Sequence, residues 1–164
     1  MAYNETFEEA VLLATFEEQS RAYEALSQIT ALDASSHVSL REAAVVARDG
    51  HGVLSLVEHS APHAHAGLLT GVISGLLAGT LAGPVGIAVG GGAGGLAGEV
   101  HDSDSSEDTE RVLHRIARDI PNGSTALLAA LGEYGFEAVN SVVRTLGGTV
   151  TRYSRADVEA EINN

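Results

Sequence analysis

A glycine repeat with a spacing of four residues constrains the fold of this 164-residue sequence more than any other feature. It lies in the stretch 66–98, which contains no charged residue and is divided into two arms by Pro84. Four residues is just over one helical turn, so each arm would form a helix with one smooth stripe that another helix can approach closely. We therefore predict a glycine-zipper helical hairpin, inserted at 66–98. Its repeating glycines are Gly67, Gly71, Gly75, Gly79, Gly83, Gly86, Gly90, Gly94 and Gly98.

The same stretch could instead be a flexible low-complexity linker, because glycine costs about 1 kcal/mol per interior helix position relative to alanine. The regular spacing and the large aliphatic residues opposite the first glycine stripe favour packed helices. These aliphatic residues are Leu68, Leu69, Val72, Ile73, Leu76, Leu77 and Leu81. We predict that Leu68, Val72 and Leu76 belong with the glycines to one interface.

Two environments could cover this apolar hairpin. In the first, hairpins from two or more copies interlock, and the protein is a self-association or scaffold module. In the second, the hairpin enters or spans the bilayer. The first arm, 66–83, would be about 27 Å long as a helix, slightly less than the hydrocarbon core of a bilayer. Aromatic and Arg anchors are absent from both flanks, so the sequence leaves both environments open.

The charge of the chain limits its partners. It contains 22 acidic and 9 basic residues, giving a formal net charge of −13. A balance this acidic repels phosphate backbones, so we predict no nucleic-acid partner. The acidic N-terminal residues lack the basic and apolar regions of a secretory signal. We therefore expect a cytoplasmic protein, with the inner face of the membrane as the alternative location.

Outside the glycine repeat, the pattern of apolar residues predicts a mixed α+β domain. Short apolar or β-branched runs predict strands, and apolar residues spaced by three or four predict helices. The predicted strands are 9–16, 40–47, 53–57, 124–131 and 149–154, and the predicted helices are 17–32, 105–119 and 136–146. A polar tail would follow the last strand.

The order of these elements suggests a topology. Asp49 and Gly50 between two apolar runs predict a hairpin, because glycine accepts the positive φ that a tight turn needs. The segment 11–14 followed by a helix is echoed by 126–129 followed by a helix. Two strand–helix–strand halves with an antiparallel sheet make a ferredoxin-like arrangement. We predict one such domain, spanning residues 1–164.

At three places the sequence resembles the bacterial family called domain of unknown function 1269. The matching segments are 44–50, the passage from Leu56 to His59 into Ala66 and Gly67, and 121–127. The resemblance implies a small α+β domain with an inserted hydrophobic hairpin, often described in that family as a membrane protein. It implies no activity. The second arm here consists largely of glycine, whereas members of the family often have larger apolar residues in the hairpin.

Histidines gather just before the glycine repeat, at His59, His63 and His65. Together with His101 and Asp102, His63 and His65 could ligate zinc, nickel or copper if the hairpin folds back on itself. They could also act as polar residues at a helix start, or as a pH-sensitive interface. We favour the helix-start interpretation and predict no cofactor.

Other chemical motifs are incomplete. The acidic run 102–108 lacks the glycine and the terminal glutamate of an EF-hand loop, and Ser105 with Asp108 resembles a helix capping box. The glycine-rich segment 90–95 has no following Lys-Ser/Thr, so it is not a phosphate-binding loop. A nucleophile elbow is also missing. We therefore predict that the protein is not an enzyme.

Overall fold

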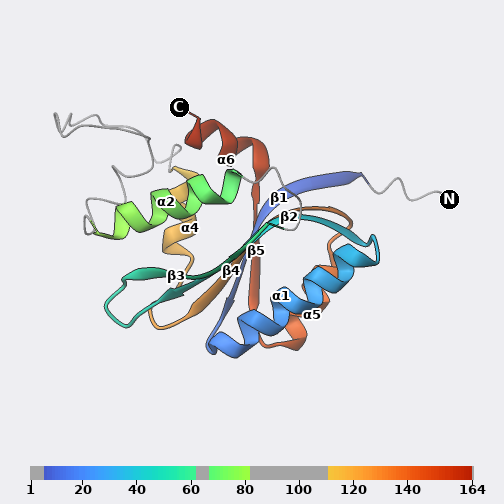
Figure 1. The fold of residues 1–164 in the computed structure, drawn as a ribbon, viewed down its shortest axis with the longest axis horizontal. Helices are drawn as coiled ribbons and strands as arrows, with labels where there is room; N and C mark the ends of the chain where they lie inside the picture. The colour runs from blue at the N-terminus through green and yellow to red at the C-terminus, as the bar shows by residue number, and fades with distance from the viewer. Residues whose placement is uncertain (1–5, 62–66, 82–110, 164) are drawn as a thin grey trace.

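A computed structural model describes residues 6–61, 67–81 and 111–163 of the chain, which form five strands and five helices (Figure 1). In chain order these are β1 (Phe7–Phe16), α1 (Gln19–Ala34), β2 (Val38–Arg48), β3 (Leu54–Ser60), α2 (Leu68–Leu81), α4 (Val112–Arg118), β4 (Thr125–Tyr134), α5 (Glu137–Thr145), β5 (Thr149–Ser154) and α6 (Arg155–Ile162). The predicted α+β class is confirmed.

The five strands form one antiparallel sheet in the order β3-β2-β4-β1-β5. Strand β4 lies between β1 and β2, so these two run in the same direction, and β1 likewise lies between β4 and β5. Helices α1 and α5 cover one face of the sheet, and α2, α4 and α6 cover the other (Figure 1). The molecule therefore has three layers with a hydrophobic core on each side of the sheet.

The two cores explain the unbroken apolar runs of the central strands. Along β4, Leu128 points toward α2, α4 and α6, whereas Leu127 and Leu131 point toward α1 and α5. A strand covered on both faces has no solvent side on which polar residues would alternate. This is why the segments 9–16 and 124–131 could be recognised as strands from composition alone.

A bulge in β2 changes which face its side chains meet. Leu40 is paired with Leu131 and Glu42 with Ala130, so Arg41 is an extra residue in the strand. Because of this insertion, Leu40 contacts the core under α1 while Glu42 points toward α2. With regular alternation, Leu40 and Glu42 would share one face.

The turn between β2 and β3 differs from the predicted one. The positive φ lies at Gly52 (+87°) and not at Gly50. The Asp49 side chain accepts hydrogen bonds from the backbone N–H groups of His51 (2.8 Å) and Val53 (2.9 Å), which stabilises a loop longer than two residues. The hydrogen bond from Val53, followed by weaker ones, lowers the pKa of Asp49 below its ordinary value.

Helices α1 and α5 end in the same way, with two backbone hydrogen bonds that define a Schellman motif. The residue that turns the chain has a left-handed conformation in both. It is Gly147 after α5 (φ +76°) but Ser36 after α1 (φ +65°). A residue with a side chain is strained in the left-handed conformation, whereas glycine is not. The end of α1 therefore has a small conformational strain energy that the end of α5 lacks.

Two predicted boundaries were wrong. The segment after Ser154 is the helix α6 and not a polar tail, because Ser154 caps it and Val158 is buried against the sheet. Helix α4 begins at Val112 and not at Ser105, because Arg111 has an extended backbone (φ −58°, ψ +137°). The predicted capping box at Ser105 and Asp108 lies outside the described residues.

Candidate functional site at helix α2

The first arm of the predicted zipper is helix α2, and its aliphatic face is buried against the chain's own sheet. Leu69 and Val72 are fully buried, and Leu76 is 4% exposed. They share a core with residues of β2, β4, α4 and α6, and Leu68 packs against its edge. The chain's own sheet, α4 and α6 therefore cover the buried aliphatic side chains of α2, the described part of the predicted hairpin.

The glycine stripe of α2 lies partly against α6. A Cβ added to Gly71 would be 2.9 Å from Cγ2 of Ile162, closer than such atoms approach in proteins. The absence of a side chain at Gly71 therefore leaves room for the Ile162 side chain where α2 meets α6. Gly67, just before the helix, has open space around it among the described residues. Gly75 is half-buried in α2.

The remaining glycines of the predicted interface fall largely outside the described part of the chain. Gly79 lies within α2, near its end. The others, which include the whole second arm, are Gly83, Gly86, Gly90, Gly94 and Gly98. The predicted hairpin is thus represented only by its first helix.

The outward face of α2 is made of small, uncharged residues. Thr70, Ser74 and Ala78 are exposed and again recur every four residues. No long side chain therefore stands between the backbone of α2 and an approaching helix along this face. Charged residues are also absent from the whole of α2, from Leu68 to Leu81.

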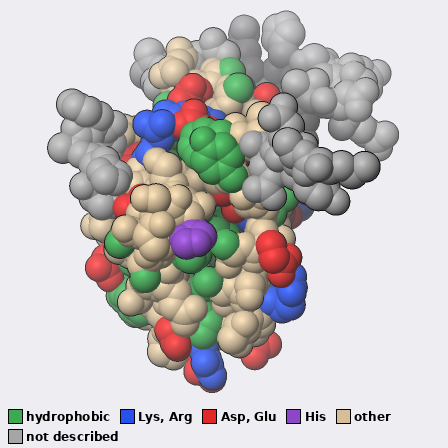
Figure 2. Space-filling model, turned by 90° about the vertical axis from the view of Figure 1, so that its right-hand side faces the viewer, with side chains coloured by type: hydrophobic (Ala, Val, Ile, Leu, Met, Phe, Trp, Pro, Cys, Tyr) green, Lys and Arg blue, Asp and Glu red, His purple; other side chains and the backbone are tan. Residues whose placement is uncertain are grey.

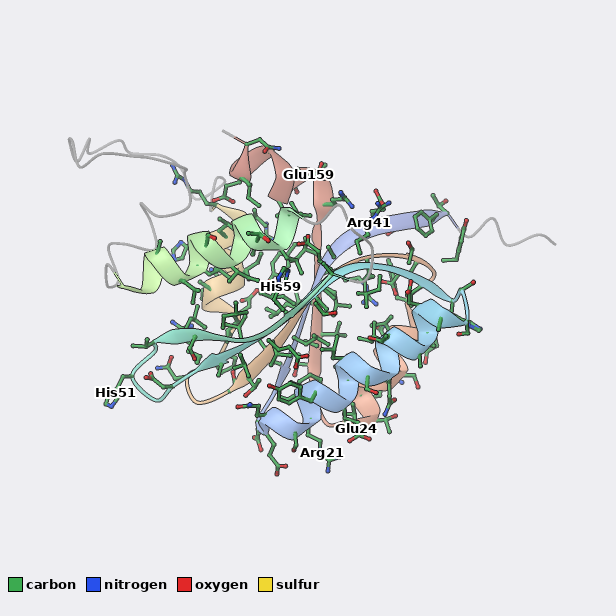
Figure 3. All side chains as sticks on the ribbon, in the orientation of Figure 1. Arg21, Glu24, Arg41, His51, His59 and Glu159 are labelled. Atoms are coloured by element: carbon green, nitrogen blue, oxygen red, sulfur yellow. The ribbon has the colours of Figure 1, made fainter. Side chains whose placement is uncertain are left out.

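A buried carboxylate lies at the start of α2. Glu42 is only 2% exposed, and its Oε2 atom accepts a hydrogen bond from the backbone N–H of Leu69 (2.9 Å). A negative charge is favourable there because the first N–H groups of a helix lack partners within the helix. On the other side of the carboxylate, Oε1 is 3.5 Å from Nε2 of His59. His59 projects from β3 into the region between the sheet and α2 (Figure 3).

Sequence reasoning did not find Glu42 as a site residue. The available signal was a single acidic residue, next to Arg41, in the mostly apolar segment from Leu40 to Ala47. Such a residue in a buried strand needs a partner, because an unpaired buried charge is costly. The bulge at Arg41, which directs Glu42 toward α2, leaves no comparable signal in the sequence.

The neighbouring helix α4 is held at both ends by charged side chains. The carboxylate of Glu161 accepts a hydrogen bond from the backbone N–H of Leu113 (3.0 Å) at its start. Arg48 donates to the carbonyl groups of Ala117 (2.6 Å) and Ile120 (2.7 Å) at its end. These contacts supply partners for backbone groups that the short helix cannot pair internally. They fix α4 between the β2–β3 hairpin and α6.

Tyr153 on β5 adds a polar contact to the same layer. Its hydroxyl donates to the carboxylate of Asp119 (2.6 Å), and the Arg115 guanidinium lies over its ring, 5.5 Å from the centroid. Burial, followed by the hydrogen bond to Asp119, raises the pKa of Tyr153 well above its usual value. The phenol therefore stays protonated and acts as a fixed donor.

A buried ion pair lies on the opposite face of the sheet. Glu133 is 1% exposed and accepts two hydrogen bonds from the Arg152 guanidinium, at 2.8 and 3.1 Å. Arg152 also donates to the side chain of Asn140 (2.7 Å) and stacks over the Phe136 ring at 4.4 Å. The pair has complete, bidentate geometry, which indicates a structural contact between β4, β5 and α5.

Exposed aromatic side chains lie where β1 begins. The rings of Phe7 and Tyr134 are tilted at 52° with centroids 5.0 Å apart, and Tyr134 is 60% exposed. Figure 2 shows hydrophobic side chains on this side of the molecule, among acidic and basic ones. The two rings line an open pocket of about 270 Å³ with residues that follow α1, including His37.

The pocket at the end of α1 contains hydroxyl, imidazole and carboxylate groups, which invites comparison with a catalytic triad. The hydroxyl next to the imidazole belongs to Ser35, which does not line the pocket; its Oγ is 2.9 Å from Nδ1 of His37 and donates to the Leu32 carbonyl. The carboxylate of Asp33 accepts from the backbone N–H of Leu40. The hydroxyl and the carboxylate thus both bind the backbone that ends α1 and begins β2, a structural role.

The predicted metal candidates His63, His65, His101 and Asp102 all lie outside the described residues. Within the described ranges, no group of three or more His, Cys, Asp or Glu side chains is arranged to hold a metal ion. Helices in these ranges also lack the length and apolar character needed to cross a membrane.

The fold and site define a class of small three-layer α+β protein with a glycine-bearing helix in one outer layer. A family model described as "Protein of unknown function (DUF1269)" matches residues 66–162, more than half of the chain. The chain belongs to this family, in agreement with the resemblance seen in its sequence. The match begins at the glycine repeat and extends through α6. Searches of curated proteins and of solved structures gave no match.

Proposed function

We propose that the protein is a non-catalytic self-association module, in which the glycine-zipper segment joins copies of the chain. The observation that carries this proposal is the outward face of α2. Thr70, Ser74 and Ala78 leave it exposed, small and uncharged, while the aliphatic face is occupied by the chain's own core. In the sequence, a second set of glycines with the same four-residue spacing runs from Gly86 to Gly98, and this arm would extend the surface if it forms the predicted helix.

In this proposal the acidic α+β domains surround the joined segments. The net charge of −13 keeps the assembly dispersed and disfavours nucleic acid as a partner. We place the protein in the cytoplasm, with the inner face of the membrane as the alternative location.

We also propose that four of the strands form a ferredoxin-like arrangement. It is supported by the order β5-β1-β4-β2, in which β1-α1-β2 and β4-α5-β5 are two halves with both helices on one face. The segment β3-α2-α4, with the glycine repeat, would then be an insertion between the two halves.

The alternative function is insertion of the hairpin into a bilayer. For α2 this would require Leu69, Val72 and Leu76 to leave the core in which they are buried. That cost favours self-association, because at α2 it would use the outward face of Thr70, Ser74 and Ala78, which is already exposed.

The test is the mass of the purified full-length chain, measured by light scattering after size exclusion without detergent. We expect a discrete oligomer. Ser74→Arg, which places a long charged side chain on the outward face of α2, should weaken association at least about tenfold. The matched control Ser27→Arg, on the exposed face of α1, should leave it unchanged.

Two results would contradict the proposal. A monomer at every concentration would exclude self-association. Recovery of the chain only in membranes, with release by detergent and flotation with lipid vesicles, would favour the bilayer alternative.

A further variant, Gly90→Leu, extends the test to the second arm of the predicted hairpin. We expect this substitution to weaken association as well.

A further inference from the structure

The two outer strands of the described sheet, β3 and β5, have edges of different character. An outer strand presents unpaired backbone N–H and C=O groups, to which another extended chain can bind. Proteins commonly obstruct such an edge with a bulge or with charged residues. Strand β3 has both, because its pairing with β2 shifts register between Val45 and Val46 and it carries Glu58. We therefore expect no further strand at the edge of β3.

Over its described length, the edge of β5 has neither obstruction. All six of its residues pair with β1 without a register shift. Thr149 is exposed, Val150 and Thr151 are half-buried, and all three are uncharged and β-branched, which suits a strand. The charged residue of the strand, Arg152, is bound on the face of the sheet by Glu133. Strand β5 therefore presents a regular edge without net charge.

The sequence around β5 also lacks the acidic residues that dominate the rest of the chain. The chain has 22 acidic residues, yet the segment from Ala138 to Ala156 contains no Asp or Glu and holds three of the nine basic residues. Each of these arginines has a carboxylate partner in its own chain, in the pairs Arg144–Glu137, Arg152–Glu133 and Arg155–Glu159. Two copies with a net charge of −13 repel each other, so a contact between them costs least where acidic residues are absent.

We propose that β5 is a second surface for self-association, and that it pairs antiparallel with β5 of another copy about a two-fold axis at Val150. The sequence from Thr149 to Thr151 is Thr-Val-Thr and reads the same in both directions. On one face, Thr149 lies opposite the partner's Thr151, and on the other face the two Val150 side chains meet. Thr–Thr pairs and pairs of β-branched residues stabilise neighbouring antiparallel strands. Arg152 then lies opposite the partner's Gly148, so this pairing brings no like charges together.

The β5 surface is separate from the outward face of α2. Helix α2 packs on β2, β3 and β4, whereas β5 is at the opposite edge of the sheet from β3. A two-fold contact joins two copies and is then satisfied, so one such contact gives a dimer. Two different two-fold contacts allow each copy to bind two neighbours, which gives a closed tetramer or a longer chain. The pairing of β5 does not depend on association through α2.

The test is the mass of the purified full-length chain, measured by light scattering after size exclusion at several concentrations. Thr149→Glu/Thr151→Glu places like charges opposite each other on both sides of the two-fold axis. It should weaken the β5 contact at least about tenfold. The matched control is Ser55→Glu/Leu56→Glu, which adds the same charge at exposed positions of β3 and should leave the mass unchanged.

Combined variants distinguish the β5 contact from the α2 contact. We expect the wild type to be larger than a dimer. Ser74→Arg should leave a dimer joined by β5, Thr149→Glu/Thr151→Glu should leave a dimer joined by α2, and all three substitutions together should give a monomer. If α2 does not join copies, the wild type should be a dimer that Ser74→Arg leaves intact and Thr149→Glu/Thr151→Glu dissociates.

A mixing experiment shows whether loss of association comes from charge at the edge or from misfolding. Thr149→Lys/Thr151→Lys should also associate poorly alone, but an equal mixture with Thr149→Glu/Thr151→Glu should restore the β5 contact, because opposite charges then face each other. Circular dichroism of both variants should match the wild type. The proposal is overturned if Thr149→Glu/Thr151→Glu associates like the wild type, or if mixing restores nothing. A monomeric wild type also overturns it, and would leave the edge open to a strand of another protein.

Discussion

Shortening Leu69 to alanine tests directly whether α2 belongs to the core of its own chain. Leu69 is fully buried in the cluster that α2 shares with the sheet, α4 and α6. If this packing exists in solution, Leu69→Ala should lower the free energy of unfolding of the isolated protein. If the aliphatic face is instead covered only by lipid or by a second copy, the substitution should have little effect on a monomer.

The expected magnitude follows from the atoms removed. Leucine has three more carbon atoms than alanine, and each buried methylene contributes about 0.8 kcal/mol, or about 2.4 kcal/mol together. The cavity left behind adds to this, and measured Leu→Ala losses in well-packed cores are about 2.7–5.0 kcal/mol. We expect a loss of about 3–4 kcal/mol, a large part of the roughly 5–15 kcal/mol typical of a domain.

The assay is urea unfolding of the full-length chain, followed by circular dichroism at two protein concentrations tenfold apart. Thr70→Ala, at the neighbouring exposed position, is the control and should change stability by less than about 0.5 kcal/mol. We expect the Leu69→Ala loss to be the same at both concentrations. A loss no larger than that of Thr70→Ala would refute the reasoning. A loss that depends on concentration would do the same, because it would mean that association buries the side chain.

Three further predictions concern other parts of the fold. Both Ser36 and Gly147 need a left-handed backbone. In urea unfolding, Ser36→Gly should therefore raise the free energy of unfolding by about 1 kcal/mol, and Gly147→Ser should lower it by a similar amount. Changes of the opposite sign would contradict this argument. Glu133→Ala should lower the free energy of unfolding by about 3–5 kcal/mol, because it leaves the Arg152 guanidinium largely buried without its partner. A loss below about 1 kcal/mol would contradict this and would mean that water replaces the carboxylate. Burial and a hydrogen bond raise the pKa of Tyr153, so the folded state should keep this proton while the unfolded chain loses it above about pH 10. Stability should therefore fall as the pH rises above that value, and Tyr153→Phe should remove this part of the fall in alkaline unfolding followed by circular dichroism.

Much of the sheet could be predicted from the sequence because its central strands are covered on both faces. Their continuous apolar runs are too short for helices, and the strand predicted at 149–154 has the bounds that the structure shows. Helix α6 was not predicted, because its sequence has little of the apolar spacing typical of a packed helix. Its buried stripe consists of little more than Val158 and Ile162, and the acidic residues between them make the segment resemble a tail.

The candidate site was predictable only in part. The spacing of the glycines predicted a helix in the first arm, but not that Gly71 would lie against Ile162, because that residue belongs to a helix that was not predicted. The contact between Glu42 and the start of α2 depends on the bulge at Arg41. A bulge depends on how two strands meet in the folded sheet, so the pattern of one strand does not predict it.

The strand order also sets when the chain can fold during synthesis. Among the described strands, β1 pairs with β4 and β5 alone, and β4 begins at Thr125, about 110 residues after β1 ends at Phe16. Of the described strands made before β4, β2 and β3 are the pair that contact each other in the sheet. At about 5–20 residues per second, the ribosome needs roughly 5–20 seconds to make the missing segment. Throughout that interval β1 is an apolar strand without partners, so the nascent chain would expose a binding site for chaperones that the finished protein conceals.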